Sequence, residues 1–163
     1  MGYLNRITLH WTGGVNTPSA TDLKHYHYLI DKDGIVYNGY YKPEDNINCQ
    51  DGVYAQHCGG GNTGNIGIAF CGCYVPSGVN VRDTIFPLSR VQLERGFKLC
   101  ADVCKKYNIP VEQVQTHYEF GKSHPATSSH GKIDITYLHP FSYVKAEDCG
   151  SFIRNKILWY YNQ

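Results

Sequence analysis

The stretch THYEFGKSHPATSSHGKID, residues 116–134, holds more reactive side chains for its length than any other part of the chain. His117 follows the short apolar and polar alternation of a predicted strand, and Asp134 follows a loop rich in glycine, proline and serine. Imidazole and carboxylate groups are ligands of catalytic zinc, which keeps three protein ligands and one open position. The stretch therefore predicts two metal ligands, and a third must come from elsewhere in the chain.

The best candidate for the third ligand is His10. Apolar and polar residues alternate over residues 6–10, which predicts a half-buried strand with His10 at its end and pointing away from the core. A glycine pair follows, and such a turn can aim the ring into a cleft. The loop before Asp134 also contains His124 and His130, and either could replace the aspartate as a ligand.

The other elements are predicted from periodicity and turn signals. The predicted strands cover residues 6–10, 26–30, 35–40, 65–74 and 112–116, and the predicted helices cover residues 89–107 and 148–161. Ser89 and Asp148 are expected to cap the two helices. The strand over residues 65–74 has one face of small side chains, suited to the floor of a cleft. These elements predict an α/β or α+β fold, in which a central mixed sheet has its helices on one face and the zinc cleft on the other.

Length, charge and apolar runs restrict the class of protein. The 163 residues are expected to form a single domain, residues 1–163, and to be monomeric. A net charge of +1 gives no strongly basic surface, so nucleic acid is not an expected partner. No apolar run reaches the length of a signal peptide or a membrane span. We therefore expect a protein that is cytoplasmic at synthesis and has no membrane partner.

The seven cysteines form an odd set without the spacing of a zinc knuckle. In a chain with no secretory signal, they are expected to be reduced and to serve as small buried side chains. An alternative is a second metal site that combines Cys71, Cys73 and a distant histidine.

Four separated motifs carry a resemblance to a known family. They are ITLHWTGG, HYHYLIDKDGIVYNG, AQHCGGGNTGNIGIAF and QTHYEF with a later GKID. In this order they resemble the zinc-dependent N-acetylmuramoyl-L-alanine amidases of the type 2 amidase family, which includes phage lysozyme-type amidases and the peptidoglycan recognition proteins. The resemblance spans about residues 4 to 135.

The resemblance implies a role for particular residues. It implies zinc as the cofactor, bound by three ligands: His10, His117 and Asp134. Tyr26 matches a tyrosine that orients or deprotonates the water of the reaction, and Lys132 matches a lysine that stabilises the tetrahedral intermediate. Other members use a glutamate where this chain has Ala69, so the tyrosine variant is implied. His57 matches a histidine of the substrate cleft and is expected to bind substrate.

The resemblance also implies an activity. It predicts hydrolysis of the amide between N-acetylmuramic acid and L-alanine in bacterial peptidoglycan, with a muropeptide as the bound partner. A compact phage endolysin without a separate cell-wall-binding domain is the leading prediction. A cytosolic wall-recycling amidase, a non-catalytic peptidoglycan-binding recognition module and a toxin effector are the alternatives. The segment between His10 and Tyr26 is short for the family, which predicts a reduced wall on one side of the groove.

Overall fold

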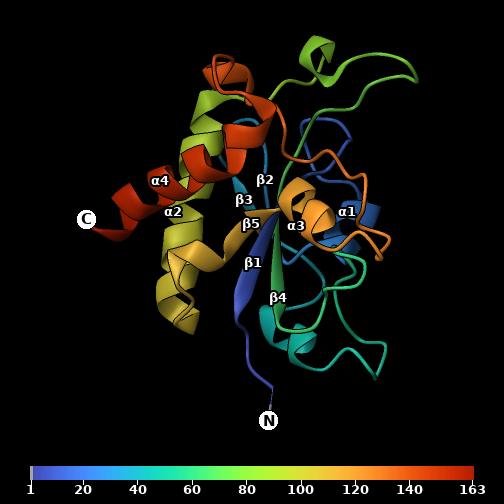
Figure 1. Ribbon diagram of the computed structural model, residues 1–163, viewed down its shortest axis with the longest axis vertical. Helices are drawn as coiled ribbons and strands as arrows, with labels where there is room; N and C mark the ends of the chain where they lie inside the picture. The colour runs from blue at the N-terminus through green and yellow to red at the C-terminus, as the bar shows by residue number, and fades with distance from the viewer. Residues whose placement is uncertain (1) are drawn as a thin grey trace.

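The computed structural model describes residues 2–163 and contains one mixed five-stranded sheet in the order β3-β2-β4-β1-β5 (Figure 1). The strands are β1 Arg6–Trp11, β2 Tyr28–Ile30, β3 Val36–Asn38, β4 Asn65–Phe70 and β5 Val114–Thr116. The α-helices are α1 Ala20–His25, α2 Arg90–Tyr107, α3 His117–Ser123 and α4 Cys149–Tyr161. Only the β2–β3 pair is antiparallel, and the strands around β1 and β4 run parallel. The predicted single-domain α/β architecture is confirmed.

Strand β1 is buried on both faces, whereas the sequence predicted a half-buried strand. It lies between β4 and β5, and Ile7, Thr8, Leu9 and His10 are all at most 1% exposed. Parallel strands in the middle of a sheet are normally covered on both sides, because the connections between them run over the two faces. Apolar and polar residues do alternate along β1, but the polar face with Thr8 and His10 lies against protein and not against solvent.

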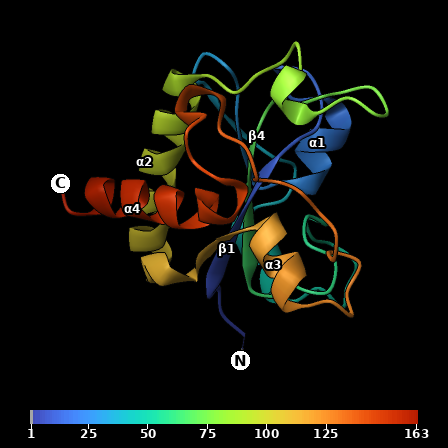
Figure 2. The ribbon, with the colours of Figure 1, turned by 45° about the horizontal axis from the view of Figure 1, so that its top comes forward.

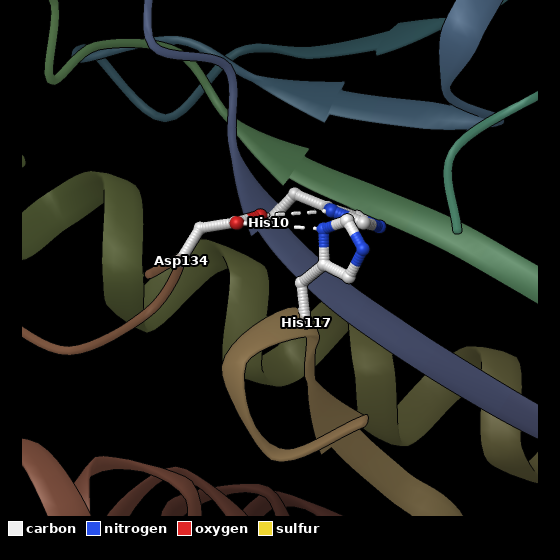
Figure 3. A group of neighbouring side chains, drawn as sticks. All are labelled: His10, His117 and Asp134. Carbon is white, nitrogen blue, oxygen red and sulfur yellow. Dashed lines mark hydrogen bonds and ion pairs between the residues drawn. The ribbon is translucent and has the colours of Figure 1, made fainter. Parts of the chain in front are cut away.

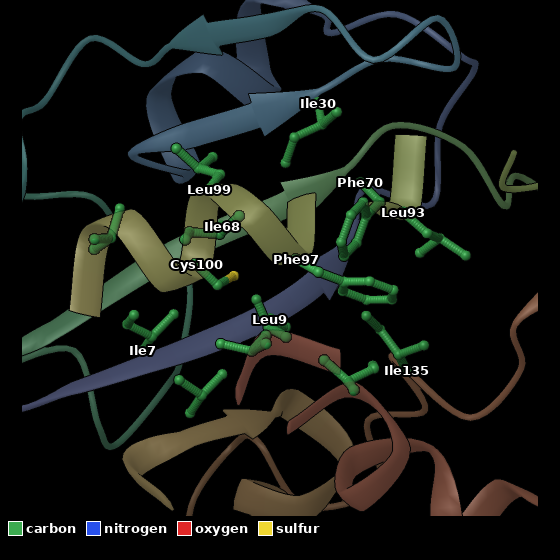
Figure 4. Close-up of a cluster of buried hydrophobic side chains, with 14 of the residues drawn as sticks. Ile7, Leu9, Ile30, Ile68, Phe70, Leu93, Phe97, Leu99, Cys100 and Ile135 are labelled. Atoms are coloured by element: carbon green, nitrogen blue, oxygen red, sulfur yellow. The ribbon is translucent and has the colours of Figure 1, made fainter. Parts of the chain in front are cut away.

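Helices α2 and α4 cover one face of the sheet and enclose the main core (Figure 4). Ile68 and Phe70 of β4 pack there with Leu9 of β1 and with Phe97 of α2, all of them at most 1% exposed. Ser89 caps α2 as predicted, since its hydroxyl accepts a hydrogen bond from the backbone N–H of Gln92. The buried apolar side chains of α2, such as Phe97, form a stripe along the helix, and their burial holds α2 against the sheet.

The short helices α1 and α3 lie on the other side of the sheet from α2 and α4 (Figures 1 and 2). Neither helix was predicted. Helix α1 lies in the short segment between His10 and Tyr26, where the Ser19–Asp22 capping box starts it. The reduced wall on this side of the groove stays a prediction. The carboxyl end of α4 points away from this side of the molecule (Figure 1).

Other differences from the prediction concern element ends. Strand β4 ends at Phe70 and not near residue 74, and the strand expected over residues 112–116 is a 3-10 turn followed by β5. Asp148 lies at the start of α4, but its side chain makes no capping hydrogen bond. Within residues 2–163, no helix combines the length and the apolar character needed to cross a bilayer.

Candidate metal centre

Three side chains far apart in the sequence meet at the carboxyl end of β1 (Figure 3). His10 Nδ1 lies 2.9 Å from Asp134 Oδ2, and His117 Nδ1 lies 3.4 Å from Asp134 Oδ1. One nitrogen or oxygen from each residue can be chosen so that all three atoms lie within 4.8 Å of one another. All three residues are buried. The set that the resemblance implied is therefore brought together, while exposed His124 and His130 lie outside it.

The register of the sheet places the two histidines side by side. Leu9 of β1 pairs with Thr116 of β5 in a parallel arrangement, so the residues that follow them, His10 in β1 and His117 directly after β5, lie at the same edge of the sheet. Thr116 also caps α3, which makes His117 the first residue of that helix. Asp134 is held against the same helix, because its carbonyl accepts a hydrogen bond of 2.6 Å from the Tyr118 backbone N–H.

A buried histidine determines which nitrogen of His10 carries a proton. His57 Nε2 lies 2.9 Å from the carbonyl oxygen of Asn65, which can only accept, so Nε2 carries the proton. Burial, beside His10 and His27, keeps the pKa of His57 well below its usual value, so the ring is neutral and its Nδ1 is an acceptor. The 3.0 Å contact from His10 Nε2 to His57 Nδ1 is then a hydrogen bond donated by His10.

Ser129 determines in the same way that Nε2 of His117 carries a proton. The hydroxyl of Ser129 donates to the carbonyl of Gly59 at 2.7 Å and lies 2.9 Å from His117 Nε2. Since the hydroxyl hydrogen is already used, Ser129 accepts from His117 Nε2–H. Nδ1 of His117 is therefore the nitrogen that faces Asp134.

The hydrogen bonds leave a set of acceptor atoms that fits a cation. With Nε2 of each ring already in a hydrogen bond, Nδ1 of His10 and Nδ1 of His117 both face the carboxylate of Asp134, and each of these contacts requires a proton or a metal ion between its two atoms. Two imidazoles and one carboxylate are a donor set of catalytic zinc sites, in which tetrahedral ligands lie about 3.3 Å apart. Two of the three separations, 2.9 and 3.4 Å, are close to that spacing, and all three ligand atoms lie within 4.8 Å of one another.

Burial and the charges of neighbouring residues have opposing effects on the pKa values of the cluster. Burial alone would raise the pKa of Asp134, but the hydrogen bonds and charges of His10 and His117 outweigh it and hold the pKa well below its usual value. Burial lowers the pKa of His10, and Asp134 opposes the shift. Burial would also lower the pKa of His117, but hydrogen bonds to Asp134 and Cys58 raise it to about 9. The carboxylate is thus ionised and ready to neutralise a cation.

The other predicted site residues lie near the cluster with different exposure. The ring of Tyr26 is half-buried and lies 5.0 Å, between centroids, from that of His10. Lys132 is exposed on the loop before Asp134, and its charge adds to the lowering of the His10 pKa by burial. His57 is buried, with both ring nitrogens hydrogen-bonded. Its expected role in substrate binding stays a prediction.

Sequence reasoning missed Ser129 and Cys58. Ser129 is fully buried, and the thiol of Cys58 lies 3.8 Å from its hydroxyl. Their roles could not be read from the sequence, because each meets His117 only through folding of separate loops. Cys71 and Cys73 join no group of possible metal ligands among residues 2–163, and burial raises the pKa of the Cys71 thiol to about 12. All seven cysteines are free.

A family model described as N-acetylmuramoyl-L-alanine amidase matches residues 2–134. The match covers most of the chain and ends at the third candidate ligand. This chain belongs to the N-acetylmuramoyl-L-alanine amidase family. Among curated proteins, none matches the sequence of this family member significantly.

Solved structures share the amidase fold at low sequence identity. The structure of PlyL is 17% identical with a TM-score of 0.51, and the alignment covers 96% of this chain and 85% of PlyL. The N-acetylmuramoyl-L-alanine amidase LysC from Clostridium intestinale is 22% identical with a TM-score of 0.50, and the alignment covers 72% of each chain. AmiD from E. coli, solved with a muropeptide, is 18% identical with a TM-score of 0.58, over 94% of this chain and 57% of AmiD.

Proposed function

We propose that the protein is a zinc-dependent N-acetylmuramoyl-L-alanine amidase that cleaves the amide between N-acetylmuramic acid and L-alanine in peptidoglycan. The observation that carries the proposal is the buried cluster of His10, His117 and Asp134, whose free acceptor atoms converge in a chain of the amidase family. A zinc ion held by these residues would supply Lewis acidity and lower the pKa of a bound water to about 7.

Tyr26 is the candidate for orienting the attacking water. Burial raises the pKa of Tyr26, and the charge of Asp134 raises it further, so the phenol stays protonated at neutral pH. A protonated phenol beside the His10 ring donates a hydrogen bond and does not act as a general base. Ala69, on the adjacent strand β4, offers no carboxylate for this purpose.

Lys132 is the candidate for stabilising the oxyanion. Its backbone N–H bonds to the carbonyl of Ser129, which ties the lysine to the loop that also orients His117. The side chain is exposed and next to the cluster, where an ammonium group can approach the carbonyl oxygen of a bound amide. A fixed positive charge at that oxygen stabilises the tetrahedral intermediate more than the planar substrate.

A muropeptide is the proposed substrate, and peptidoglycan is the proposed partner. Support comes from the family description and from AmiD, which was solved with anhydro-N-acetylmuramic acid-L-Ala-D-γ-Glu-L-Lys. We further propose an endolysin role for a monomeric, single-domain protein made in the cytoplasm, because Lys132 matches a lysine of the phage-type members. Digestion of intact sacculi distinguishes this role from that of a recycling amidase, which cleaves only soluble fragments.

The proposal is tested by metal analysis and peptidoglycan digestion on the same preparations. Wild-type protein should bind one zinc ion per chain and release stem peptides with a new L-alanine amino terminus. His117→Ala should lose most of the metal and at least about 100-fold in activity. His124→Ala removes an exposed histidine of the neighbouring loop and should change neither property. Full activity of the metal-free wild type would contradict the proposal, and zinc binding without cleavage would indicate a non-catalytic recognition module.

A further inference from the structure

We propose that His57 is a positioning residue of the metal site, which holds His10 in the tautomer that directs Nδ1 at the ion, and that it does not bind substrate. The proposal rests on the zinc site proposed above. Two hydrogen-bond contacts, of 2.9 and 3.0 Å, connect three groups: the carbonyl of Asn65, the ring of His57 and the ring of His10.

The backbone carbonyl of Asn65 determines which group donates in each of these hydrogen bonds. A carbonyl oxygen has no proton to give, so His57 must donate through Nε2 and accept through Nδ1. The only group that meets this Nδ1 in the observed contacts is His10 Nε2, which must therefore carry a proton. A neutral His10 can then offer only Nδ1 to a metal, and this is the nitrogen that faces Asp134.

The ring of His57 is fixed in place by strand β4 and by a second histidine. A side-chain carbon added to Gly67 would lie 2.6 Å from Cγ of His57, so the ring fills the space that the glycine leaves. The ring of His27 lies 5.7 Å away between centroids. His27 is itself held, because its Nδ1 accepts from the Gly67 N–H and its Nε2 donates to Asn46. His57 therefore cannot flip without breaking both of its hydrogen bonds.

The same arrangement excludes direct recognition of substrate. His57 is 6% exposed, and neither ring nitrogen is free to meet a sugar or a peptide. Its influence on the reaction must pass through His10. Groups that orient a metal-binding histidine in this way typically change metal affinity by about 10–100-fold when they are removed.

The test uses two substitutions of His57 and one matched control. His57→Leu removes the acceptor, whereas His57→Asn can place its side-chain oxygen near the original Nδ1 position. His139→Leu is the control, because His139 also uses both ring nitrogens, with Leu88 and Val81, but lies away from the cluster. We expect the zinc dissociation constant, measured against a competing chelator, to rise about 10–100-fold in His57→Leu, to recover largely in His57→Asn and to stay unchanged in the control.

Nitrogen NMR of the wild type tests the hydrogen bond itself, whether or not a variant folds. The Nε2 resonance of His10 should show a bound proton and a coupling across the hydrogen bond to Nδ1 of His57. A bare Nε2 on His10 would overturn the proposal. So would a His57→Leu protein with unchanged zinc affinity and a raised KM, which would return His57 to the substrate site. Failure of the wild type to bind zinc would instead contradict the proposed function, since the NMR result stands without metal.

Discussion

At the scale of single residues, three neutral imidazoles form a connected group in the interior. His10, His27 and His57 are buried, and burial lowers the pKa of each. Each ring uses both nitrogens in contacts with defined partners, so the tautomers are determined by the neighbours. Neutral rings of this kind are suited to hold a metal ligand in one orientation.

The buried ring of His27 predicts a loss of stability in acid. Its pKa is lowered from 6.5 to about 4, so the unfolded chain takes up a proton that the folded protein does not. The contribution of His27 is complete above pH 6.5 and is lost as the pH falls toward 4, by up to about 1.4 kcal/mol per pH unit. Urea unfolding between pH 7 and 4.5 should show a steeper decline for wild type than for His27→Gln. Equal slopes would contradict this assignment.

The sequence identified the three candidate metal ligands but not the residues that orient them. The sequence could suggest three ligands, His10, His117 and Asp134, because each lies in a recognisable local motif. That they meet at one site was implied by the family resemblance. The partners His57 and Ser129 could not be assigned in the same way. Their hydrogen bonds join positions 47 and 12 residues apart and depend on how loops pack.

At the scale of elements, helix α3 determines where His117 lies. Thr116 and Glu119 form a capping box at its first turn, and the carboxylate of Glu119 also accepts two hydrogen bonds, of 2.8 and 2.9 Å, from Arg154 of α4. These contacts tie the start of the helix to the helical layer on the other face. His117 is therefore held by a helix end that is fixed from two directions.

The capping box predicts a coupling between local stability and metal binding. Thr116→Ala should lower the free energy of unfolding by about 1 kcal/mol, because the N–H of Glu119 loses its acceptor. Zinc binding should weaken as well, since His117 is the first residue of the helix. Thr116→Ser keeps the hydroxyl and should retain most of both properties. The measurements are denaturant unfolding and chelator competition, and an alanine variant with undiminished zinc affinity would show that the cap does not position His117.

Elements with a strong apolar period were predicted, and the short helices were not. Helix α2 spans 18 residues with a continuous buried stripe, which sequence periodicity detects readily. Helix α1 buries no residue at all, so only its capping box, Ser19 with Asp22, marked it. Helix α3 has three buried residues, and its T-x-x-E start, Thr116 with Glu119, directly follows a predicted strand and precedes a stretch rich in glycine, proline and serine, so no apolar period marks it. The sheet order depends on parallel pairing between distant strands, which local patterns do not encode.

At the scale of the whole molecule, the main apolar core and the candidate metal site lie on opposite faces of one sheet. The core under α2 and α4 contains the large apolar side chains, whereas the other face of β1 and β4 contains His10 and the small residues Gly67 and Ala69. Large side chains on the second face would fill the space that the histidines use.

This division predicts that a core substitution changes stability without changing the site. Phe97→Ala should lower the free energy of unfolding by about 3–5 kcal/mol, because a fully buried ring is replaced by a cavity. Zinc affinity of the folded fraction should equal that of wild type, since Phe97 packs on the face away from His10. Phe97→Leu should show the same independence with a smaller loss. A large fall in zinc affinity at temperatures where the variant is folded would disprove the separation.

The position of the carboxyl end beyond α4, on the side away from α1 and α3, has a practical consequence (Figure 1). A tag, a fluorescent reporter or a second binding module fused there would project from the helical layer and leave the approach to the histidines open. The amidase could thus be tethered to a surface or given a new target specificity by extension at that end, with no change to His10, His117 or Asp134.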